Sequence, residues 1–379
     1  MDFNYTQEQQ QFKDALRRFI DKDYTFEDRN KIVHSASGIS DSAWATLTEL
    51  GMTALPIPEE QGGFDGTAVD MLVVMQEIGR GLLVEPYFAT MLGAQFLKLA
   101  GGKGPLLEQV AGGTLKLAAA LGEQQSRHEL FNVATTAKQQ GESFLINGTK
   151  TVVIHGGQAD QIIVSCRTGG DQRDTAGISL FIVPANAKGV TRRDYRTIDC
   201  QRAADISFSN VEVPASALLG KIGDGWDILE AATDYGVSLL CAEAVGAMDA
   251  LNVATLEYLK TRQQFGVPIG KFQALQHRMA EMFMQAEQAR SMATLAAVKM
   301  SSPDANERRR TASAAKARVG QALKYVGQQA VQLHGGMGVT NELPAAHHFK
   351  RLTMIELTLG DTDHHLARFA AQEDFRKVA

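Results

Sequence analysis

Cysteine is scarce in this chain and an excess of positive charge is missing, and each shortage excludes a class of protein. Its 379 residues include three cysteines, Cys166, Cys200 and Cys241. They lack the spacing of a metal site and cannot all pair with one another, so we expect reduced thiols and a cytoplasmic protein. The net charge of −5 and the pI of about 6.0 give no electrostatic basis for binding nucleic acid.

Long hydrophobic runs and a secretion signal are also missing. The most apolar stretches are interrupted by Glu, Asp or Gly before the roughly 20 residues that a membrane-spanning helix needs. The first residues lack the basic-then-apolar layout of a signal peptide. Hydrophobic residues make up 44% and charged residues 21% of the chain, so we expect a soluble globular protein without a membrane partner.

Hydrophobic periodicity predicts three domains. Residues 1–115 repeat apolar positions with the helical period. Residues 116–215 contain short segments rich in Ile, Val and Phe without helices between them, which is typical of an antiparallel sheet. Residues 216–379 return to the helical period in long stretches that suit a helix bundle. The predicted fold class is multidomain α+β, with an N-terminal helical domain, a central antiparallel β domain and a C-terminal four-helix-bundle-like domain.

Local patterns place three boundaries. Thr6 and Gln9 form a capping-box pattern that starts the first helix. The dipeptide Asn147-Gly148 is a strong signal for a two-residue hairpin. The glycines after "AVQLH", beginning at Gly335, end a long helix and let a ligand approach the backbone, although a plain helix cap explains them as well.

A second candidate for ligand binding lies in "YLKTRQQFGVPIGKFQ". Arg262 and Gln273 stand on two predicted helices joined by a turn that contains Gly and Pro. An Arg fixed at such a turn could bind a phosphate through two parallel hydrogen bonds. An ordinary helical hairpin with exposed polar residues is the alternative interpretation.

Several segments together resemble the acyl-CoA dehydrogenase family along nearly the whole chain. They are "MDFNYTQEQQQF", "LPIPEEQGGF", "TRQQFGVPIGKFQALQHRMAEM" and "AVQLHGGMGVTNELP". Within the family, "LCAEAVGAMDA" and "FKRLTMIELTLGDTDHHLAR" are similar to the small subunit of pimeloyl-CoA dehydrogenases. The resemblance implies FAD, α,β-dehydrogenation of an acyl-CoA thioester, and electron transfer to an electron-transfer flavoprotein. It also implies a homotetramer, or a heterotetramer with a related large subunit.

The resemblance further implies which residues contact the cofactor, with part of the site coming from a neighbouring subunit. The implied positions are Arg262, Phe265, Gln273, Gln332, Leu333, His334, Gly335 and Gly336, together with Asp361 and Asp363 after Gly360. Asp234 matches a position near bound substrate.

The chain departs from the family where the catalytic base is expected. Many members carry a Glu immediately before the loop glycine that corresponds to Gly360, and this chain has Leu359 there. A second branch places its Glu on the helix after the β domain, where this chain has Gly236. Hydroxyl groups that would bond the flavin or the thioester are also missing, so backbone groups of residues 121–123 and 152–154 are the expected substitutes.

Glu243 is the first candidate for the missing base. It lies in the apolar segment "SLLCAEAVGAM", seven residues and roughly 10.5 Å after Gly236 on the same helical face. A buried, unpaired carboxylate tends toward a raised pKa, which suits proton abstraction. The alternative is a structural pair with an Arg of another helix or subunit.

Two other interpretations stay open. Asp361 and Asp363 are the next candidates for the base, although helix capping explains them as well, and Glu356 is expected to face another helix. The chain could also supply no base, and serve as a base-less subunit of a heteromeric dehydrogenase or as a flavin-binding protein without dehydrogenase activity. We predict no metal site, because the adjacent histidines His364 and His365 point about 100° apart on a helix; the same holds for the pair at 347 and 348.

Overall fold

The computed structural model describes residues 5–372, which form two compact units. The bundle unit contains the described residues up to Lys31, Thr67–Leu83 and those from Val237 onward. The sheet unit contains Ile32–Gly66 and Val84–Gly236. Two helices, α2 (Phe26–His34) and α7 (Trp226–Thr261), run through the boundaries between these segments.

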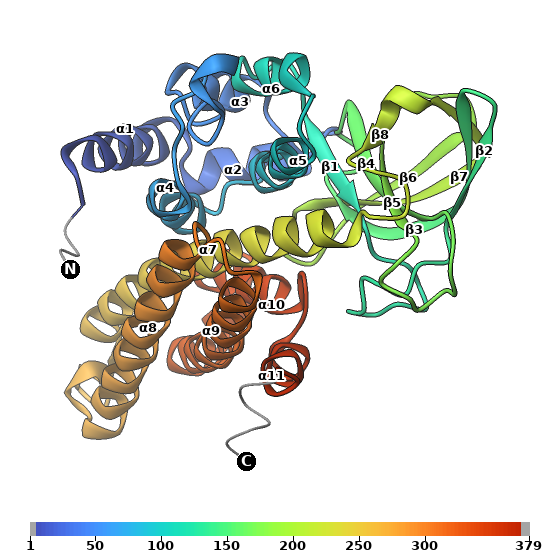
Figure 1. Ribbon diagram of the computed structural model, residues 1–379. Helices are drawn as coiled ribbons and strands as arrows, with labels where there is room; N and C mark the ends of the chain where they lie inside the picture. The colour runs from blue at the N-terminus through green and yellow to red at the C-terminus, as the bar shows by residue number, and fades with distance from the viewer. Residues whose placement is uncertain (1–4, 373–379) are drawn as a thin grey trace. The chain divides into compact units, whose positions relative to one another are not determined.

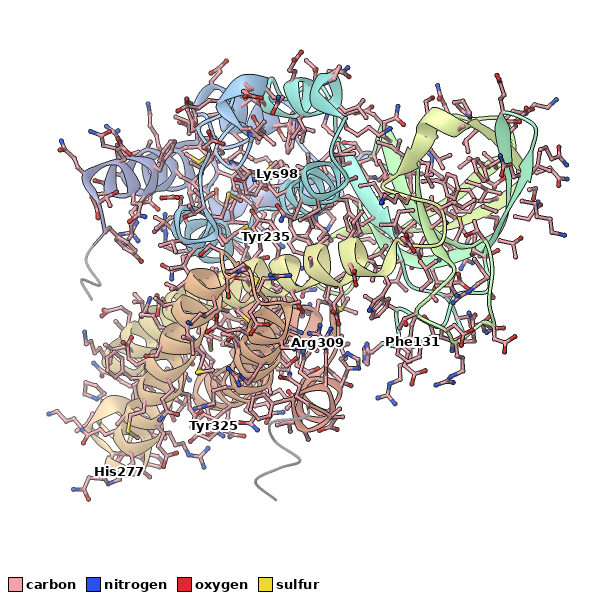
Figure 2. All side chains as sticks on the ribbon, viewed as in Figure 1. Lys98, Phe131, Tyr235, His277, Arg309 and Tyr325 are labelled. Atoms are coloured by element: carbon pink, nitrogen blue, oxygen red, sulfur yellow. The ribbon has the colours of Figure 1, made fainter. Side chains whose placement is uncertain are left out.

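The bundle unit is helical. Besides the second part of α7, its helices are α1 (Gln7–Asp23), α4 (Ala68–Gly81), α8 (Gln273–Lys299), α9 (Ala305–His334), α10 (Pro344–Leu357) and α11 (Thr362–Ala370). Helices α8 and α9 lie side by side, and α10 and α11 pack on α9 (Figure 1). Tyr325 of α9 donates a hydrogen bond to Glu281 of α8 (Figure 2).

Two glycines allow the backbones of α4 and α7 to come into direct contact where the two helices cross. A Cβ on Gly79 would overlap the carbonyl oxygen of Glu243, and a Cβ on Gly246 would overlap that of Gln76. Helix α7 is long and apolar enough to cross a membrane by length and composition, contrary to the sequence prediction. Because 78% of its most apolar window is buried inside the protein, its apolarity is that of a core helix.

The sheet unit combines helices with an eight-stranded sheet. Its helices are α3 (Asp41–Glu49), α5 (Tyr87–Ala100) and α6 (Gly104–Ala111). Its strands are β1 (Leu117–Ala120), β2 (Thr136–Gln140), β3 (Ser143–Ile154), β4 (Gln161–Arg167), β5 (Ile178–Pro184), β6 (Val190–Arg196), β7 (Arg202–Pro214) and β8 (Leu218–Leu219). The strand order is β6-β7-β3-β2-β4-β5-β8, and β1 pairs in parallel with β4. Phe131 packs edge-to-face on Trp226 at the start of α7, with 6.0 Å between ring centroids (Figure 2).

The hairpin prediction at Asn147-Gly148 is wrong. Both residues lie inside β3, where the register against β7 shifts between Ile146 and Gly148. A Cβ on Gly148 would overlap Thr135, so this glycine permits a close approach within a bulge. The two-residue turn lies earlier, between Gln140 and Ser143.

Other boundary predictions are confirmed. The Thr6 side chain accepts a hydrogen bond from the Gln9 backbone N–H, and the Gln9 side chain accepts one from the Thr6 N–H. Helix α9 ends at His334, and Gly335 follows with a φ of 59°. The order of helices, strands and helices confirms the predicted multidomain α+β class. The sheet is mixed and not purely antiparallel, because β1 and β2 each pair in parallel with β4.

Candidate active site

Arg262, Phe265 and Gln273, three of the predicted cofactor contacts, lie between the end of α7 and the start of α8 in the bundle unit. Helix α7 ends just before Arg262, and a two-stranded ribbon of β9 (Gln263–Gln264) and β10 (Val267–Pro268) leads to α8. The side chain of Arg262 is exposed. Gln273 opens α8, whose first turn receives no side-chain cap. An exposed guanidinium and an uncapped helix N-terminus suit an anionic group such as a phosphate.

Phe265 stands at the tip of the same ribbon. It is 90% exposed, its φ is 56°, and its ring meets Phe272 edge-to-face at 6.1 Å. Positive φ is uncommon for a bulky residue and costs backbone strain. A large exposed aromatic side chain held in this conformation suits contact with a ligand or another chain.

The glycine loop after α9 lies close to this ribbon. The His334 ring stacks on Tyr258, four residues before Arg262, with 4.5 Å between centroids. Its Nδ1 lies 2.8 Å from the Ala330 carbonyl oxygen. Leu333 and His334 are buried, and the rest of the predicted contact set, Gln332, Gly335 and Gly336, is exposed. The structure therefore brings two of the predicted cofactor segments to one end of the bundle unit, and a Cβ on Gly335 or Gly336 would meet no neighbour within 4 Å.

A buried lysine of α9 donates hydrogen bonds to the backbone of the junction between α10 and α11. The Nζ of Lys316 donates hydrogen bonds to the carbonyl oxygens of Glu356 at 2.9 Å, Thr358 at 2.9 Å and Gly360 at 2.5 Å. Burial lowers the pKa of Lys316 to about 8. A cation at this position satisfies carbonyl groups that the end of α10 leaves without helical partners.

Leu359 occupies the position where the family resemblance predicts a base. Its φ is 55°, the φ of Gly360 is 104°, and the Leu359 side chain is partly exposed. Its carbonyl oxygen lies 2.9 Å from Nε2 of His365. Backbone contacts with Lys316 and His365 therefore hold the loop.

The acids and histidines around this loop have structural contacts. The Asp361 side chain accepts a hydrogen bond from the His364 N–H at 2.8 Å and caps α11, while Asp363 is exposed in the first turn. Glu356 accepts hydrogen bonds from Thr362 and pairs with Lys324 of α9 at 2.7 Å, so the expectation that it faces another helix is confirmed. Among residues 5–372, no group of three or more His, Cys, Asp or Glu is placed to bind a metal ion.

Glu243 is buried but has a partner. The Nε of Arg351 on α10 donates to its Oε1 at 2.6 Å, and the Nη2 donates to its Oε2 at 2.8 Å. Both side chains are at most 9% exposed. The unpaired carboxylate expected from the apolar helix is therefore not found, and the structural alternative describes the observed geometry.

The predicted substrate residue lies in the part of α7 that belongs to the sheet unit. Asp234 is buried there. Its contact with substrate, like the catalytic roles of Glu243 and Asp361 and the cofactor contacts of Asp361 and Asp363, stays a prediction.

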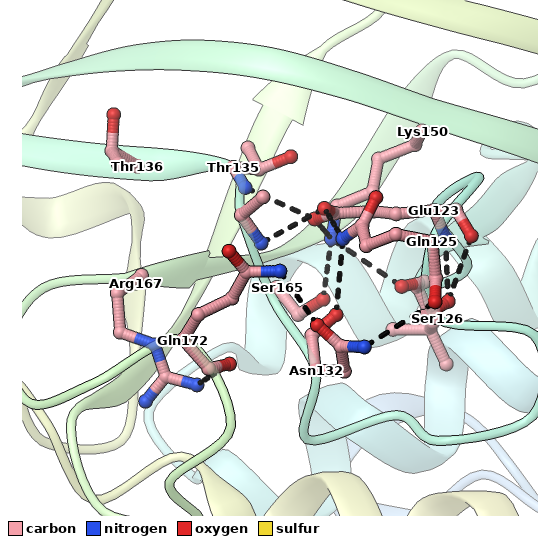
Figure 3. Close-up of polar contacts among 12 residues, drawn as sticks. Glu123, Gln125, Ser126, Asn132, Thr135, Thr136, Lys150, Ser165, Arg167 and Gln172 are labelled. Atoms are coloured by element: carbon pink, nitrogen blue, oxygen red, sulfur yellow. Dashed lines mark hydrogen bonds and ion pairs between the residues drawn. The ribbon is translucent and has the colours of Figure 1, made fainter.

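The two backbone segments predicted to face the cofactor lie beside each other in the sheet unit. The Thr151 N–H donates to the Gly122 carbonyl oxygen at 2.9 Å. Val152 is 52% exposed with a φ of 53°, and its N–H donates to Oδ1 of Asp205 at 3.1 Å. Behind these segments lies a buried ion pair between Glu123 and Lys150 that sequence reasoning missed (Figure 3). A lysine within the alternating pattern of a strand was the available signal.

Comparisons with known proteins match the chain over most of its length. Sequence profiles of the N-terminal, middle and C-terminal domains of acyl-CoA dehydrogenase match residues 6–103, 118–211 and 223–373. A probable acyl-CoA dehydrogenase of Bacillus subtilis is 29% identical over 374 residues, covering 96% of this chain and 97% of that one.

Solved structures show the same fold. The glutaryl-CoA complex of glutaryl-coenzyme A dehydrogenase superposes with a TM-score of 0.91 at 26% identity, covering 100% of this chain and 98% of that one. A chain of the ChsE4-ChsE5 complex from Mycobacterium tuberculosis superposes with a TM-score of 0.88 at 25% identity, covering 98% of both chains.

Proposed function

Because this chain belongs to the acyl-CoA dehydrogenase family, whose members are flavoprotein oxidoreductases that act on CH–CH groups, we propose that it serves as a subunit of a heteromeric acyl-CoA dehydrogenase. Family membership supports FAD as its cofactor. In this proposal, a related large subunit supplies the carboxylate that removes the α-proton of the acyl-CoA thioester.

The observation that carries the proposal is the ion pair between Glu243 and Arg351. Both oxygens of Glu243 accept charge-assisted hydrogen bonds from the buried Arg351 guanidinium. This geometry supports a structural role for Glu243 and a base that comes from another chain.

The reaction needs a base because the α-proton of a thioester is only weakly acidic. A carboxylate must accept this proton while hydrogen-bond donors stabilise the negative charge that develops on the thioester oxygen. FAD, when bound, accepts the β-hydrogen as a hydride. Leu359 has no group that accepts a proton, and Gly236 has no side chain. The proposal therefore assigns proton abstraction to another chain and cofactor binding to this one.

Three features support FAD binding by this chain. The exposed guanidinium of Arg262 and the uncapped start of α8 suit the pyrophosphate. The loop at Gly335 and Gly336 has space for close approach by a ligand. The stacked pair of Tyr258 and His334 joins these two features at one end of the bundle unit.

The partners belong to the proposal as well. One chain of the ChsE4-ChsE5 complex, whose name gives two components, superposes on this chain, which supports assembly with a second, different chain. We propose that this partner is a related large subunit in a heterotetramer. We further propose an electron-transfer flavoprotein as electron acceptor and a medium-chain, long-chain or dicarboxylyl acyl-CoA, such as pimeloyl-CoA, as substrate. A substrate with a terminal carboxylate needs a cation at the end of its pocket.

Anaerobic reduction of the bound flavin tests this function. The purified chain is titrated with acyl-CoA thioesters of several chain lengths, with and without a terminal carboxylate, alone and after co-expression with the related large subunit. We expect a yellow protein whose flavin is bleached only in the complex. Bleaching of the chain alone, abolished in a Glu243→Gln variant that is still folded and still binds flavin, would assign the base to Glu243. Bound flavin that is never bleached would indicate a flavoprotein without dehydrogenase activity.

A further inference from the structure

The sheet unit contains a salt bridge that is almost completely removed from solvent. The Nζ of Lys150 on β3 lies 2.7 Å from Oε1 of Glu123, and the two side chains are 0% and 3% exposed. Lys150 also donates to Oγ of Ser165 at 2.9 Å and to the Leu121 carbonyl oxygen at 3.3 Å. An ammonium group has three donors, so all of its hydrogen-bonding capacity is used (Figure 3).

The Glu123 carboxylate is equally well satisfied. Its Oε1 also accepts the Thr135 N–H at 3.1 Å, and its Oε2 accepts the Ala134 N–H at 2.9 Å and Nε2 of Gln125 at 2.7 Å (Figure 3). Burial alone would raise the pKa of Glu123, but the Lys150 ammonium outweighs it and lowers that pKa to about 2. Burial lowers the pKa of Lys150, and the Glu123 carboxylate opposes this shift at 2.7 Å.

The contacts of this pair join four separate segments of the chain. Glu123 belongs to the loop after β1, its backbone donors precede β2, Lys150 lies on β3 and Ser165 lies on β4. A buried ion pair is weak evidence for stability, because an apolar pair of similar volume often stabilises a protein as well or better. What distinguishes the ion pair is that its directional hydrogen bonds fix the positions of the segments it joins.

One of these segments leads directly into a strained surface residue. Thr151, next to Lys150, donates its N–H to Gly122, and Val152 follows at a φ of 53° with half of its side chain exposed. For a β-branched residue this φ is an outlier, and such outliers persist where the surroundings hold them and where ligands bind. The ion pair fixes Lys150 just before this bulge, and the Gly122 and Asp205 contacts hold the N–H groups of Thr151 and Val152 within it.

We propose that Glu123 and Lys150 are positioning residues for the flavin. The pair fixes the 121–123 loop against the Thr151–Val152 bulge, so that backbone groups of both segments meet the cofactor in one geometry. Backbone groups fixed in this way replace the side-chain hydroxyls that this chain lacks at the same segments. The inference rests on the proposed function, since it requires that the chain binds FAD.

The test replaces the pair by apolar residues of similar size, Glu123→Leu with Lys150→Met, and measures three properties of the holoprotein. These are thermal stability, the dissociation constant for FAD, and the visible circular dichroism of the bound flavin. The matched control is Glu129→Gln with Arg173→Met, which removes an exposed salt bridge of the same unit. Glu123→Gln with Lys150→Met, which keeps the shape of the Glu123 side chain and leaves no unpaired charge, is measured in parallel and decides the matter if the first double variant does not fold.

We expect a folded variant that binds FAD about tenfold or more weakly, with an altered flavin dichroism, while the control resembles wild type. Unchanged FAD affinity and dichroism in a folded variant would overturn the proposal and leave the pair a purely structural role. A wild-type protein that binds no FAD would instead contradict the proposed function, and this role with it.

Discussion

Glu243 on α7 and Arg351 on α10 face each other inside the bundle unit as a bidentate ion pair, with nitrogen–oxygen distances of 2.6 and 2.8 Å. The pair links two helices through residues that are 108 positions apart in the chain. The pair gives the first candidate for the base a buried partner on another helix, and it leads to the first prediction.

Glu243→Gln should destabilise the protein strongly, because it leaves the Arg351 cation buried without a counter-charge. Breaking a buried pair from one side typically costs about 3–5 kcal/mol of unfolding free energy. Urea denaturation measures the loss. The control is Glu257→Gln, which breaks an exposed pair with Lys260 and should cost less than about 1 kcal/mol. Equal stability of the two variants would show that the Glu243 pair contributes no more than a surface contact.

Lys316→Met should remove a stability increase that the wild type shows at alkaline pH. Burial lowers the pKa of Lys316 from 10.5 to about 8. Between these values the unfolded chain holds a proton that the folded chain has released, so stability rises with pH by up to about 1.4 kcal/mol per unit. Between pH 7.5 and about 10, the unfolding free energy of the wild type, measured by denaturation, should rise relative to that of the variant. A difference that does not change with pH would contradict the assignment, and Lys271→Met controls for the loss of an exposed cation.

His348→Gln should reduce the loss of unfolding free energy that the wild type shows as the pH falls from 7 to 5. Burial, with the Arg29 cation nearby, lowers the pKa of His348 from 6.5 to about 3. As the pH falls below 6.5, His348 becomes protonated in the unfolded state but stays neutral in the folded state, so the wild type loses stability. His365, whose pKa burial lowers to about 2, acts in the same direction. The measurement is the unfolding free energy at pH 7, 6 and 5, and parallel profiles for wild type and variant would refute it.

Gly246→Ala should be among the most damaging single methyl additions in the bundle unit. The new Cβ would overlap the Gln76 backbone carbonyl of α4, which cannot move without separating the two helices. We expect a loss of about 3 kcal/mol or more. Gly112→Ala is the control, because its Cβ would meet neighbours only at 3.5 Å or beyond. A melting temperature for Gly246→Ala within a degree or so of the control would contradict the close crossing.

The parts of the fold that the sequence predicts are those decided by neighbouring residues. The Thr6 cap, the end of α9 at Gly335 and the cap at Asp361 depend on side chains and backbone groups a few positions apart. The Asn147-Gly148 hairpin failed because contact with Thr135, in another segment, places the glycine in a bulge. The Asn-Gly sequence is compatible with both a hairpin turn and a β-bulge, and tertiary packing determines which of the two forms.

The candidate site was harder to predict because its decisive contacts are long-range. Nothing near Glu243 in the sequence identifies Arg351 as its partner, and nothing near Lys150 identifies Glu123. The segment "LGDTDHH" predicts either a site or a capped helix junction. The structure shows a junction whose backbone carbonyl groups accept hydrogen bonds from Lys316 of α9. Its role beside the flavin, like the cytoplasmic location, stays a prediction.

The central claim is that this chain binds flavin but supplies no catalytic base, and restoring a base tests it most directly. Leu359 stands in a loop shaped by Lys316 and His365, so Leu359→Glu adds a carboxylate without disturbing the contacts that hold the loop. The measurement is the rate of anaerobic flavin bleaching by acyl-CoA in the isolated chain. We predict no bleaching for wild type and measurable bleaching for Leu359→Glu. Rapid bleaching of the isolated wild-type chain would contradict the account.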